Sequence, residues 1–369
     1  MSVDERDTMS AIYPNPITQL TFVACLLGYC LFASCQNQPP YRHTGETIRG
    51  ANLVAPPQKP ADTTLRALKA DGGTWVAIVP YGFCRAGEPH FYWHGNRPPG
   101  QRRGGGQWWG ETPQGVAETV QMARAQGLKV MLKPHVWMQG GSHLDLAFDK
   151  EADWQTFEAD YRGYVLSNAR LADSLKLDLF CITTELDKFA LARPDFWKQL
   201  IADVRQVYKG KLTYAANWDR YDKLPFWDQL DYIGVDAYFP LSDDKTPSVK
   251  AMVRGWKKPI AALNQLSATY QKPILFTEFG YRSCDRTAEK PWDSETDCEP
   301  NMAAQANAYT ALYEAVGPQS WFAGGFVWKW FMLERRRPGG NGRERDMYSP
   351  QGKSAETVLQ RTWGKAVGK

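Results

Sequence analysis

Eight short apolar runs, each followed by a helical pattern or a long polar connection, constrain the fold of this 369-residue chain more than any other feature. Several runs are nearly continuous in Val, Ile, Leu, Phe and Ala, which is typical of strands buried on both faces. Strands that alternate with helices predict a parallel sheet with crossover connections. The runs are residues 47–54, 74–81, 129–136, 179–186, 212–218, 232–239, 273–280 and 322–330.

The segments between the runs have helical periodicity. Residues 114–126 and 303–315 carry apolar side chains at spacings of three and four, which predicts amphipathic helices. The same pattern precedes the fourth run, where it comprises Trp154, Phe157, Tyr161, Val165, Ala169 and Ala172. Eight strands, each followed by a helix or a long loop, predict an α/β fold with a single (β/α)₈ barrel. We assign residues 47–369 to this predicted barrel domain.

The longest irregular connections follow the runs instead of preceding them. They are residues 84–112, 138–151, 240–248, 281–300 and 331–348. A (β/α)₈ barrel builds its active site from the loops at the C-terminal ends of its strands. The long connections therefore predict a functional site at that end of the barrel.

Two of the predicted strands end in glutamate, at Glu185 and Glu278. A carboxylate at the mouth of a buried strand is unfavourable unless it is paired or used in chemistry. Cleavage of a glycosidic bond needs two carboxylates in different environments, because one must donate a proton to the leaving oxygen while the other is ionised. We interpret Glu185 and Glu278 as such a pair.

The amino-acid composition favours some classes of function and argues against others. The chain has 15 Trp, 17 Tyr and 16 Phe, whose flat rings suit the apolar faces of sugars, although any single one can equally belong to the core. The net charge of +4 comes from scattered Lys and Arg and does not indicate nucleic-acid binding. Of the histidines only His135 ends a predicted strand, which argues against a metal-dependent barrel hydrolase.

Four segments resemble glycoside hydrolase family 113, namely ITTELDKF, YIGVDAYFPL, FTEFGYRS and GGFVWKWF. The similarity runs from about residue 47 to residue 359. The characterised members of this family are β-1,4-mannanases, and its clan carries catalytic glutamates at the ends of strands four and seven. The resemblance implies a retaining glycosidase that acts on β-1,4-linked mannan or glucomannan chains by double displacement. It implies no organic cofactor and no metal, because two carboxylates suffice.

The resemblance also implies roles for individual residues. Glu185 corresponds to the general acid/base and Glu278 to the nucleophile. Tyr238 stands where the clan places a residue that hydrogen-bonds the nucleophile; the alternative is an aromatic of the barrel rim. Either Trp328 or Trp330 is expected to form the floor under the sugar at the cleaved position.

Further side chains at strand ends are candidate sugar ligands. The resemblance favours Lys133 and Asn217 as ligands of sugar hydroxyls, with Asn52 as a weaker candidate. His135 is either a ligand or a structural histidine. Thr184 departs from the wider clan, where an Asn at that position holds the sugar 2-hydroxyl, so that contact is expected to come from elsewhere.

Trp108 and Trp109 lie in the Gly-rich connection after the second run. They either stack on sugar rings beyond the cleaved bond or pack against the barrel rim. The alternative to an enzyme is a surface lipoprotein that binds glycans on a barrel scaffold without cleaving them, but the presence of both glutamates favours catalysis. We expect a monomer whose partners are a β-linked glycan and a membrane.

The N-terminal segment predicts export. Residues 20–34 are apolar and end at Cys35, in a stretch shorter than the roughly 20 residues of a membrane-spanning helix. The run fits the apolar region of a signal peptide, and Phe32-Ala33-Ser34-Cys35 resembles a bacterial lipobox. We predict a signal peptide at residues 1–34, lipidation of Cys35, a polar tether at 35–46 and attachment to a periplasm-facing or cell-surface membrane. The segment lacks the usual basic cluster, and an ordinary membrane anchor is the alternative.

Cys284 and Cys298 flank a polar stretch and are candidates for a disulfide in an oxidising compartment. Two free thiols are the alternative.

The lipobox resemblance makes a direct prediction. Cys35→Ser should abolish incorporation of a labelled fatty acid and leave an uncleaved precursor or a soluble product, because the acyl acceptor is lost. Mass spectrometry of the mature N-terminus checks this. An unmodified N-terminus at Met1 or Met9 in the wild type would contradict it.

Overall fold

The computed structural model describes residues 39–94, 96, 108–332 and 347–364. The compact unit treated below begins at Pro40. Cys35 and the predicted signal peptide lie outside the described residues, so both stay predictions. Within the described part of the chain, no helix combines the length and the apolar character needed to cross a membrane.

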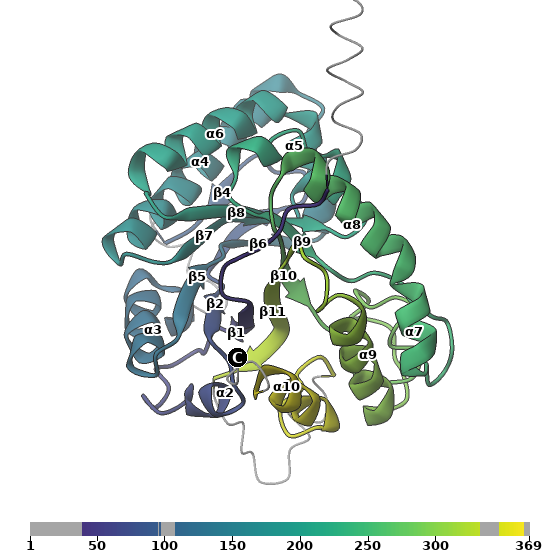
Figure 1. Cartoon of the computed structure of the whole chain (residues 1–369). Helices are drawn as coiled ribbons and strands as arrows, with labels where there is room; N and C mark the ends of the chain where they lie inside the picture. The colour runs from purple at the N-terminus through teal and green to yellow at the C-terminus, as the bar shows by residue number, and fades with distance from the viewer. Residues whose placement is uncertain (1–38, 95, 97–107, 333–346, 365–369) are drawn as a thin grey trace, which may run out of the picture. The chain divides into compact units, whose positions relative to one another are not determined.

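Eight strands form a closed parallel barrel in which each strand pairs with the next one along the chain and the last pairs with the first (Figure 1). This confirms the predicted (β/α)₈ fold, with one barrel strand in each apolar run. The strands are β1 (Ile48–Val54), β2 (Trp75–Ile78), β5 (Lys129–Leu132), β7 (Leu179–Thr184), β8 (Lys211–Asn217), β9 (Ile233–Asp236), β10 (Ile274–Phe279) and β11 (Phe322–Phe331).

Helices surround the barrel (Figure 1). The three predicted helices are present as α3 (Pro113–Ala125), α4 (Glu151–Ser174) and α9 (Met302–Ala315), and the predicted apolar face of α4 is buried. The side chain of Thr112 caps α3 by accepting from the backbone N–H of Gly115. The other helices are α2 (Arg66–Ala70), α5 (Asp187–Ala192), α6 (Pro194–Val207), α7 (Val249–Gly255), α8 (Lys257–Tyr270) and α10 (Ser354–Gly364).

The core has two parts because barrel strands are apolar on both faces. The larger cluster includes outward-facing strand residues such as Phe180 and Phe276 and the helix residues packed against them. The smaller cluster, drawn from the opposite faces of the strands, fills the barrel and consists of Ile48, Trp75, Ala77, Met131, Leu179, Cys181, Ala215, Leu275 and Phe326. Its apolar side chains form the base on which polar residues at the C-terminal strand ends rest.

Two of the predicted eight-residue strands are each split at a proline. Pro80 and Pro134 follow β2 and β5, and the chain beyond them forms a second sheet of β3 (Tyr81–Arg85), β4 (Phe91–Tyr92) and β6 (His135–Gln139) in the order β4-β3-β6. Proline has no backbone N–H, so it interrupts the barrel ladder. The split places His135 on the second sheet, outside the barrel wall.

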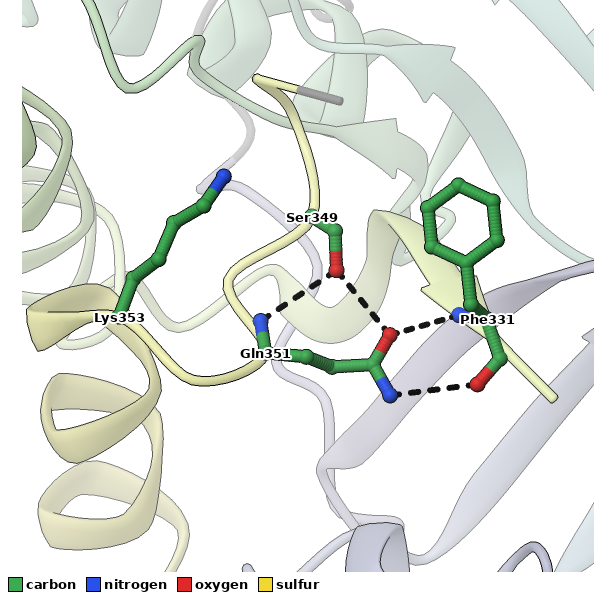
Figure 2. Close-up of a pocket in the computed structure, with 4 residues that line it drawn as sticks. All are labelled: Phe331, Ser349, Gln351 and Lys353. Carbon is green, nitrogen blue, oxygen red and sulfur yellow. Dashed lines mark hydrogen bonds between the residues drawn. The ribbon is translucent and has the colours of Figure 1, made fainter. Parts of the chain in front are cut away.

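A glutamine side chain extends the hydrogen bonding at the end of β11. The Oε1 atom of Gln351 accepts from the backbone N–H of Phe331 at 2.7 Å, and its Nε2 donates to the Phe331 carbonyl at 3.2 Å (Figure 2). The hydroxyl of Ser349 donates to the same Oε1 at 3.0 Å. The amide therefore acts as a strand neighbour and fixes the segment after residue 346 to the barrel.

Closure of β11 on β1 depends on a glycine. Gly324 has φ +101°, and a Cβ atom there would lie 2.1 Å from the carbonyl oxygen of Ile48. Gly352 has φ +73° but nothing within 4 Å of such an atom. Gly324→Ala should lower the free energy of unfolding by about 3 kcal/mol or more, and the matched control Gly352→Ala by about 1 kcal/mol. Urea unfolding checks both, and equal losses would contradict the steric argument.

Candidate active site

Glu278 lies at the C-terminal end of β10 with its carboxylate almost completely buried. Lys133, which follows β5, places its ammonium against Oε1. The hydroxyl of Tyr238 donates to Oε2 at 2.7 Å, which is the contact that the family resemblance implied. The Lys133 nitrogen also lies 5.5 Å from the ring centroid of Trp328. Both carboxylate oxygens of Glu278 are therefore held by hydrogen-bond donors.

The electrostatics of this pair are those of a buried charge cluster. Burial raises the pKa of Glu278, and the Glu185 carboxylate raises it further, against the opposing effects of Lys133 and Tyr238. Burial lowers the pKa of Lys133, but Glu278 and Asp236 outweigh this effect and hold that pKa above its ordinary value. A buried charge needs a partner of opposite sign. Lys133 is therefore a charged counterion of Glu278.

Glu185 follows β7 directly and has φ +53°, in the left-handed region that disfavours residues with a Cβ by about 1–2 kcal/mol. The strand contains an extra residue just before it, because Cys181 pairs with Thr213 but Thr184 pairs with Ala215. Bulges of this kind redirect side chains and are frequent beside active sites. The strained backbone and the bulge turn Glu185 away from regular strand geometry.

A histidine that was not predicted lies beside Glu185. His143 stands in a short 3₁₀ turn, His143–Asp145, with its Nε2 3.5 Å from Oε2 of Glu185. Its ring packs edge-on against that of His135, at 4.9 Å between centroids, and His135 stacks on Tyr81 at 5.0 Å. Burial, followed by the effects of His143 and Lys133, lowers the pKa of His135 well below its ordinary value. His135 is therefore a neutral ring that supports His143.

Two buried aspartates, Asp236 and Asp187, lie near the two glutamates. Asp236, the last residue of β9, is fully buried and accepts a hydrogen bond from the Thr277 hydroxyl at 2.7 Å. Burial and the nearby Glu278 carboxylate raise its pKa well above the ordinary value. Asp187 accepts from the backbone N–H of Asn217 at 2.8 Å, and burial raises its pKa to about 7. Their only sequence signal is a carboxylate near a strand end, since Asp236 is the last residue of β9 and Asp187 lies three residues after the end of β7.

The two predicted asparagines have different surroundings. Asn217 ends β8, and within the described residues its side-chain Oδ1 has no hydrogen-bond partner. Asn52 is fully buried and donates to the carbonyls of Thr277 at 3.1 Å and Phe326 at 3.4 Å. The Oδ1 atom of Asn52 also lacks a partner among the described residues, so the two differ in burial and not in this respect. Asn217 is partly exposed at its strand end and can meet a ligand, whereas Asn52 is fully buried and cross-links strands.

The four predicted tryptophans differ in their exposure. Trp328 faces Lys133 at the barrel mouth, whereas Trp330 is fully buried in the larger core cluster and is not available to a sugar. The strand register explains the difference between Trp328 and Trp330. Ala51 pairs with Val327 but Leu53 pairs with Trp330, so β11 contains one extra residue there and its later side chains point to the other face of the strand. Trp108 is exposed, while Trp109 packs against the core.

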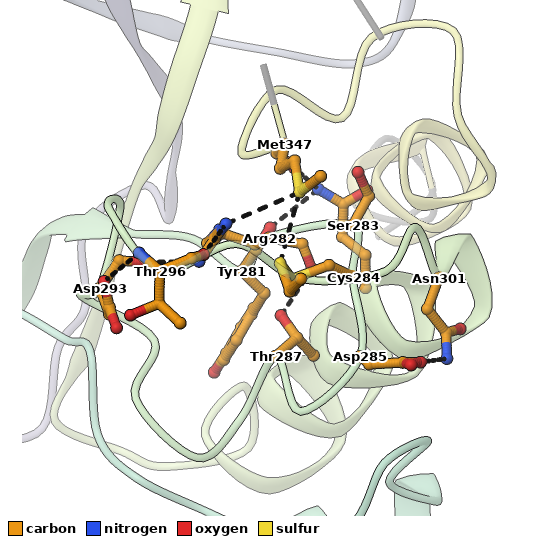
Figure 3. The surroundings of a disulfide bond; sticks show 12 residues. Tyr281, Arg282, Ser283, Cys284, Asp285, Thr287, Asp293, Thr296, Asn301 and Met347 are labelled. Carbon is orange, nitrogen blue, oxygen red and sulfur yellow. Dashed lines mark hydrogen bonds between the residues drawn. A yellow bond between two sulfur atoms is a disulfide. The ribbon is translucent and has the colours of Figure 1, made fainter. Parts of the chain in front are cut away.

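A disulfide joins Cys284 and Cys298, with 5.8 Å between their Cα atoms, in the connection after β10 (Figure 3). The guanidinium of Arg282 donates across the same loop to the carbonyls of Asp293 at 3.0 Å and Thr296 at 2.7 Å. The loop beside the Glu278 strand is thus held by one covalent and two hydrogen-bonded links.

The sequence model of glycoside hydrolase family 113 matches residues 109–353, which include both glutamates. The chain belongs to glycoside hydrolase family 113. It is therefore a glycosidase, and the predicted family is confirmed. No curated protein sequence matches the chain.

Solved structures agree with the family assignment. The family 113 β-mannanase AaManA from Alicyclobacillus acidocaldarius is 26% identical, with a TM-score of 0.74 over 87% of this chain and 98% of that one. A family 113 β-1,4-mannanase is 23% identical, with a TM-score of 0.72 over 87% and 99%. A Ruminococcus gnavus β-glucuronidase shares the fold at 11% identity, with a TM-score of 0.56 over 86% of this chain and 50% of its own.

The raised pKa of Asp187 predicts a pH-dependent stability. Its carboxyl has a pKa of about 7 in the folded state against 3.8 ordinarily, so its contribution is full below pH 4 and is lost as the pH rises toward 7. Asp187→Asn removes this titration. The free energy of unfolding of the variant relative to the wild type should therefore rise by about 1.4 kcal/mol per pH unit across that window. Urea unfolding at pH 4.5, 6 and 7.5 checks this, and a constant difference would contradict it.

Proposed function

We propose that this glycosidase is a retaining enzyme that cleaves β-1,4-linked mannan or glucomannan chains, with Glu278 as the nucleophile and Glu185 as the general acid/base. The observation that carries the proposal is the contrast between the two carboxylates. Glu278 is buried against the Lys133 ammonium, whereas Glu185 lies beside a histidine ring at the rim. A double displacement needs this difference, because one group must be ionised while the other carries a proton.

In the first step an oxygen of Glu278 attacks the anomeric carbon while Glu185 donates its proton to the departing oxygen. A covalent glycosyl ester forms and the shortened chain leaves. In the second step Glu185 takes a proton from water, which attacks the same carbon and releases the Glu278 carboxylate. Lys133 and Tyr238 orient Glu278 throughout, and they favour its ionised form before attack and after release.

Family membership supports the proposed substrate class. The two family 113 structures compared above are described as a β-mannanase and a β-1,4-mannanase. Release of reducing sugar from mannan, glucomannan, cellulose and xylan tests the assignment, and mannan or glucomannan should be cleaved fastest. We further propose that the enzyme is exported and attached to a membrane through Cys35, on the strength of the apolar run and lipobox at residues 20–35.

The two glutamates should differ kinetically. Glu278→Ala should abolish hydrolysis, and azide should restore cleavage of an activated aryl glycoside with a product of inverted configuration. Glu185→Ala should lose about 10²–10⁴-fold in activity on polymer but retain turnover of an activated aryl glycoside, which needs no proton donor. Steady-state kinetics and NMR of the products check both roles.

Glu314→Ala is the control, because this exposed glutamate lies on α9 away from the site. If Glu185→Ala hydrolysed polymer at the wild-type rate, the acid/base role would be wrong.

A further inference from the structure

Three tryptophans of the described chain stay largely exposed: Trp108 at 42%, Trp137 at 61% and Trp292 at 40%. Each lies in a connection that follows a barrel strand, so all three stand at the end of the barrel that carries the glutamates. Trp292 differs from the others because its indole stacks on a second indole. The centroids of Trp292 and Trp218 are 4.8 Å apart and their planes differ by 23°.

The Trp218–Trp292 pair is close to the carboxylates. Trp218 directly follows Asn217, whose strand position pairs with Asp236, which in turn pairs with Glu278. On the other side, the carbonyl of Pro291 accepts a hydrogen bond from the hydroxyl of Tyr348 at 2.6 Å. The ring of Tyr348 is 6.5 Å from that of Tyr238, the residue that donates to Glu278. Both members of the pair are thus linked to the catalytic rim through one or two neighbouring residues.

The loop that carries Trp292 is fixed before any ligand binds. It is closed by the Cys284–Cys298 disulfide and held by Arg282, and its Asp293 side chain accepts from the backbone N–H groups of Glu295 and Thr296 at 3.0 Å each (Figure 3). An exposed indole on an ordered loop can bind without losing much conformational freedom. Tryptophans that serve only packing, such as Trp227 and Trp256, are fully buried.

We propose that Trp292, supported from behind by Trp218, forms a carbohydrate subsite that stacks on a pyranose ring of the substrate chain beyond the sugar being cleaved. The proposal rests on the proposed function. A pyranose ring offers a flat face of C–H groups that matches an indole in size and polarity, and the stacked Trp218 fixes the plane of the Trp292 ring. The Cys284–Cys298 disulfide positions this subsite. The number of sugar rings that the enzyme binds therefore depends on that bond.

The test compares Trp292→Leu, which keeps an apolar side chain but loses the flat ring, with Trp292→Phe, which keeps an aromatic ring. The ratio of kcat/KM for β-1,4-mannohexaose to that for 4-nitrophenyl β-mannoside should fall about fivefold in Trp292→Leu and less than twofold in Trp292→Phe. Cys284→Ser with Cys298→Ser should lower the same ratio. Calorimetry in a Glu278→Gln background measures the dissociation constant of mannohexaose without turnover, and Trp292→Leu should raise it about fivefold.

The outcomes separate the two proposals. If the wild type binds and cleaves mannohexaose but Trp292→Leu changes neither the ratio nor the dissociation constant, the subsite is refuted while the proposed function stands. A lower melting temperature with an equal loss on both substrates would mean that Trp292 only holds its loop, which also refutes the subsite. If the wild type neither binds nor cleaves mannan or glucomannan, the proposed function fails and the subsite fails with it.

Discussion

The pairing of β11 with β1 is the constraint on which the site depends. Because all eight strands are parallel and the ladder closes, their carboxyl ends meet at one rim. Residues more than a hundred positions apart in the sequence, such as Lys133 and Glu278, come into contact there. Gly324 permits the close approach of the first and last strands, so one position without a side chain supports the geometry of a site to which it contributes no atom.

Small departures from regular strand geometry aim the functional side chains. In β7 an extra residue precedes Glu185, and in β10 an extra residue separates the pairing of Phe276 from that of Glu278. A third shift lies in β11 between Val327 and Trp330. Each shift moves later residues to another face of their strand. The regular strands thus fix the position of the backbone, and the bulges determine which side chains point toward the C-terminal rim of the barrel.

The sequence predicts the frame well, because a buried parallel strand needs a continuous apolar run and a crossover helix needs a period near 3.6. It also indicates Glu185 and Glu278, since a carboxylate at a buried strand end is conspicuous. It does not reveal the bulges, and for this reason it leaves Trp328 and Trp330 as alternatives for the sugar floor, of which Trp330 lies in the core. His143 could not be predicted either, because its contact with Glu185 depends on how a loop returns to the rim. Pro80 and Pro134 are visible signals for the second sheet, because proline has no backbone N–H to donate to the barrel ladder.

The buried cluster of Lys133, Asp236 and Glu278 bears on how such an enzyme evolves and how it can be engineered. Replacing buried ionisable groups by apolar or neutral residues of the same shape is often neutral or stabilising, because burial removes the charged groups from water. Selection for thermal stability alone would therefore accept uncharged residues at these positions and yield stable proteins that have lost their catalytic activity. Directed evolution of this barrel for thermal stability therefore needs an activity screen in every round. The helices outside the barrel can be stabilised by substitution without loss of these catalytic groups.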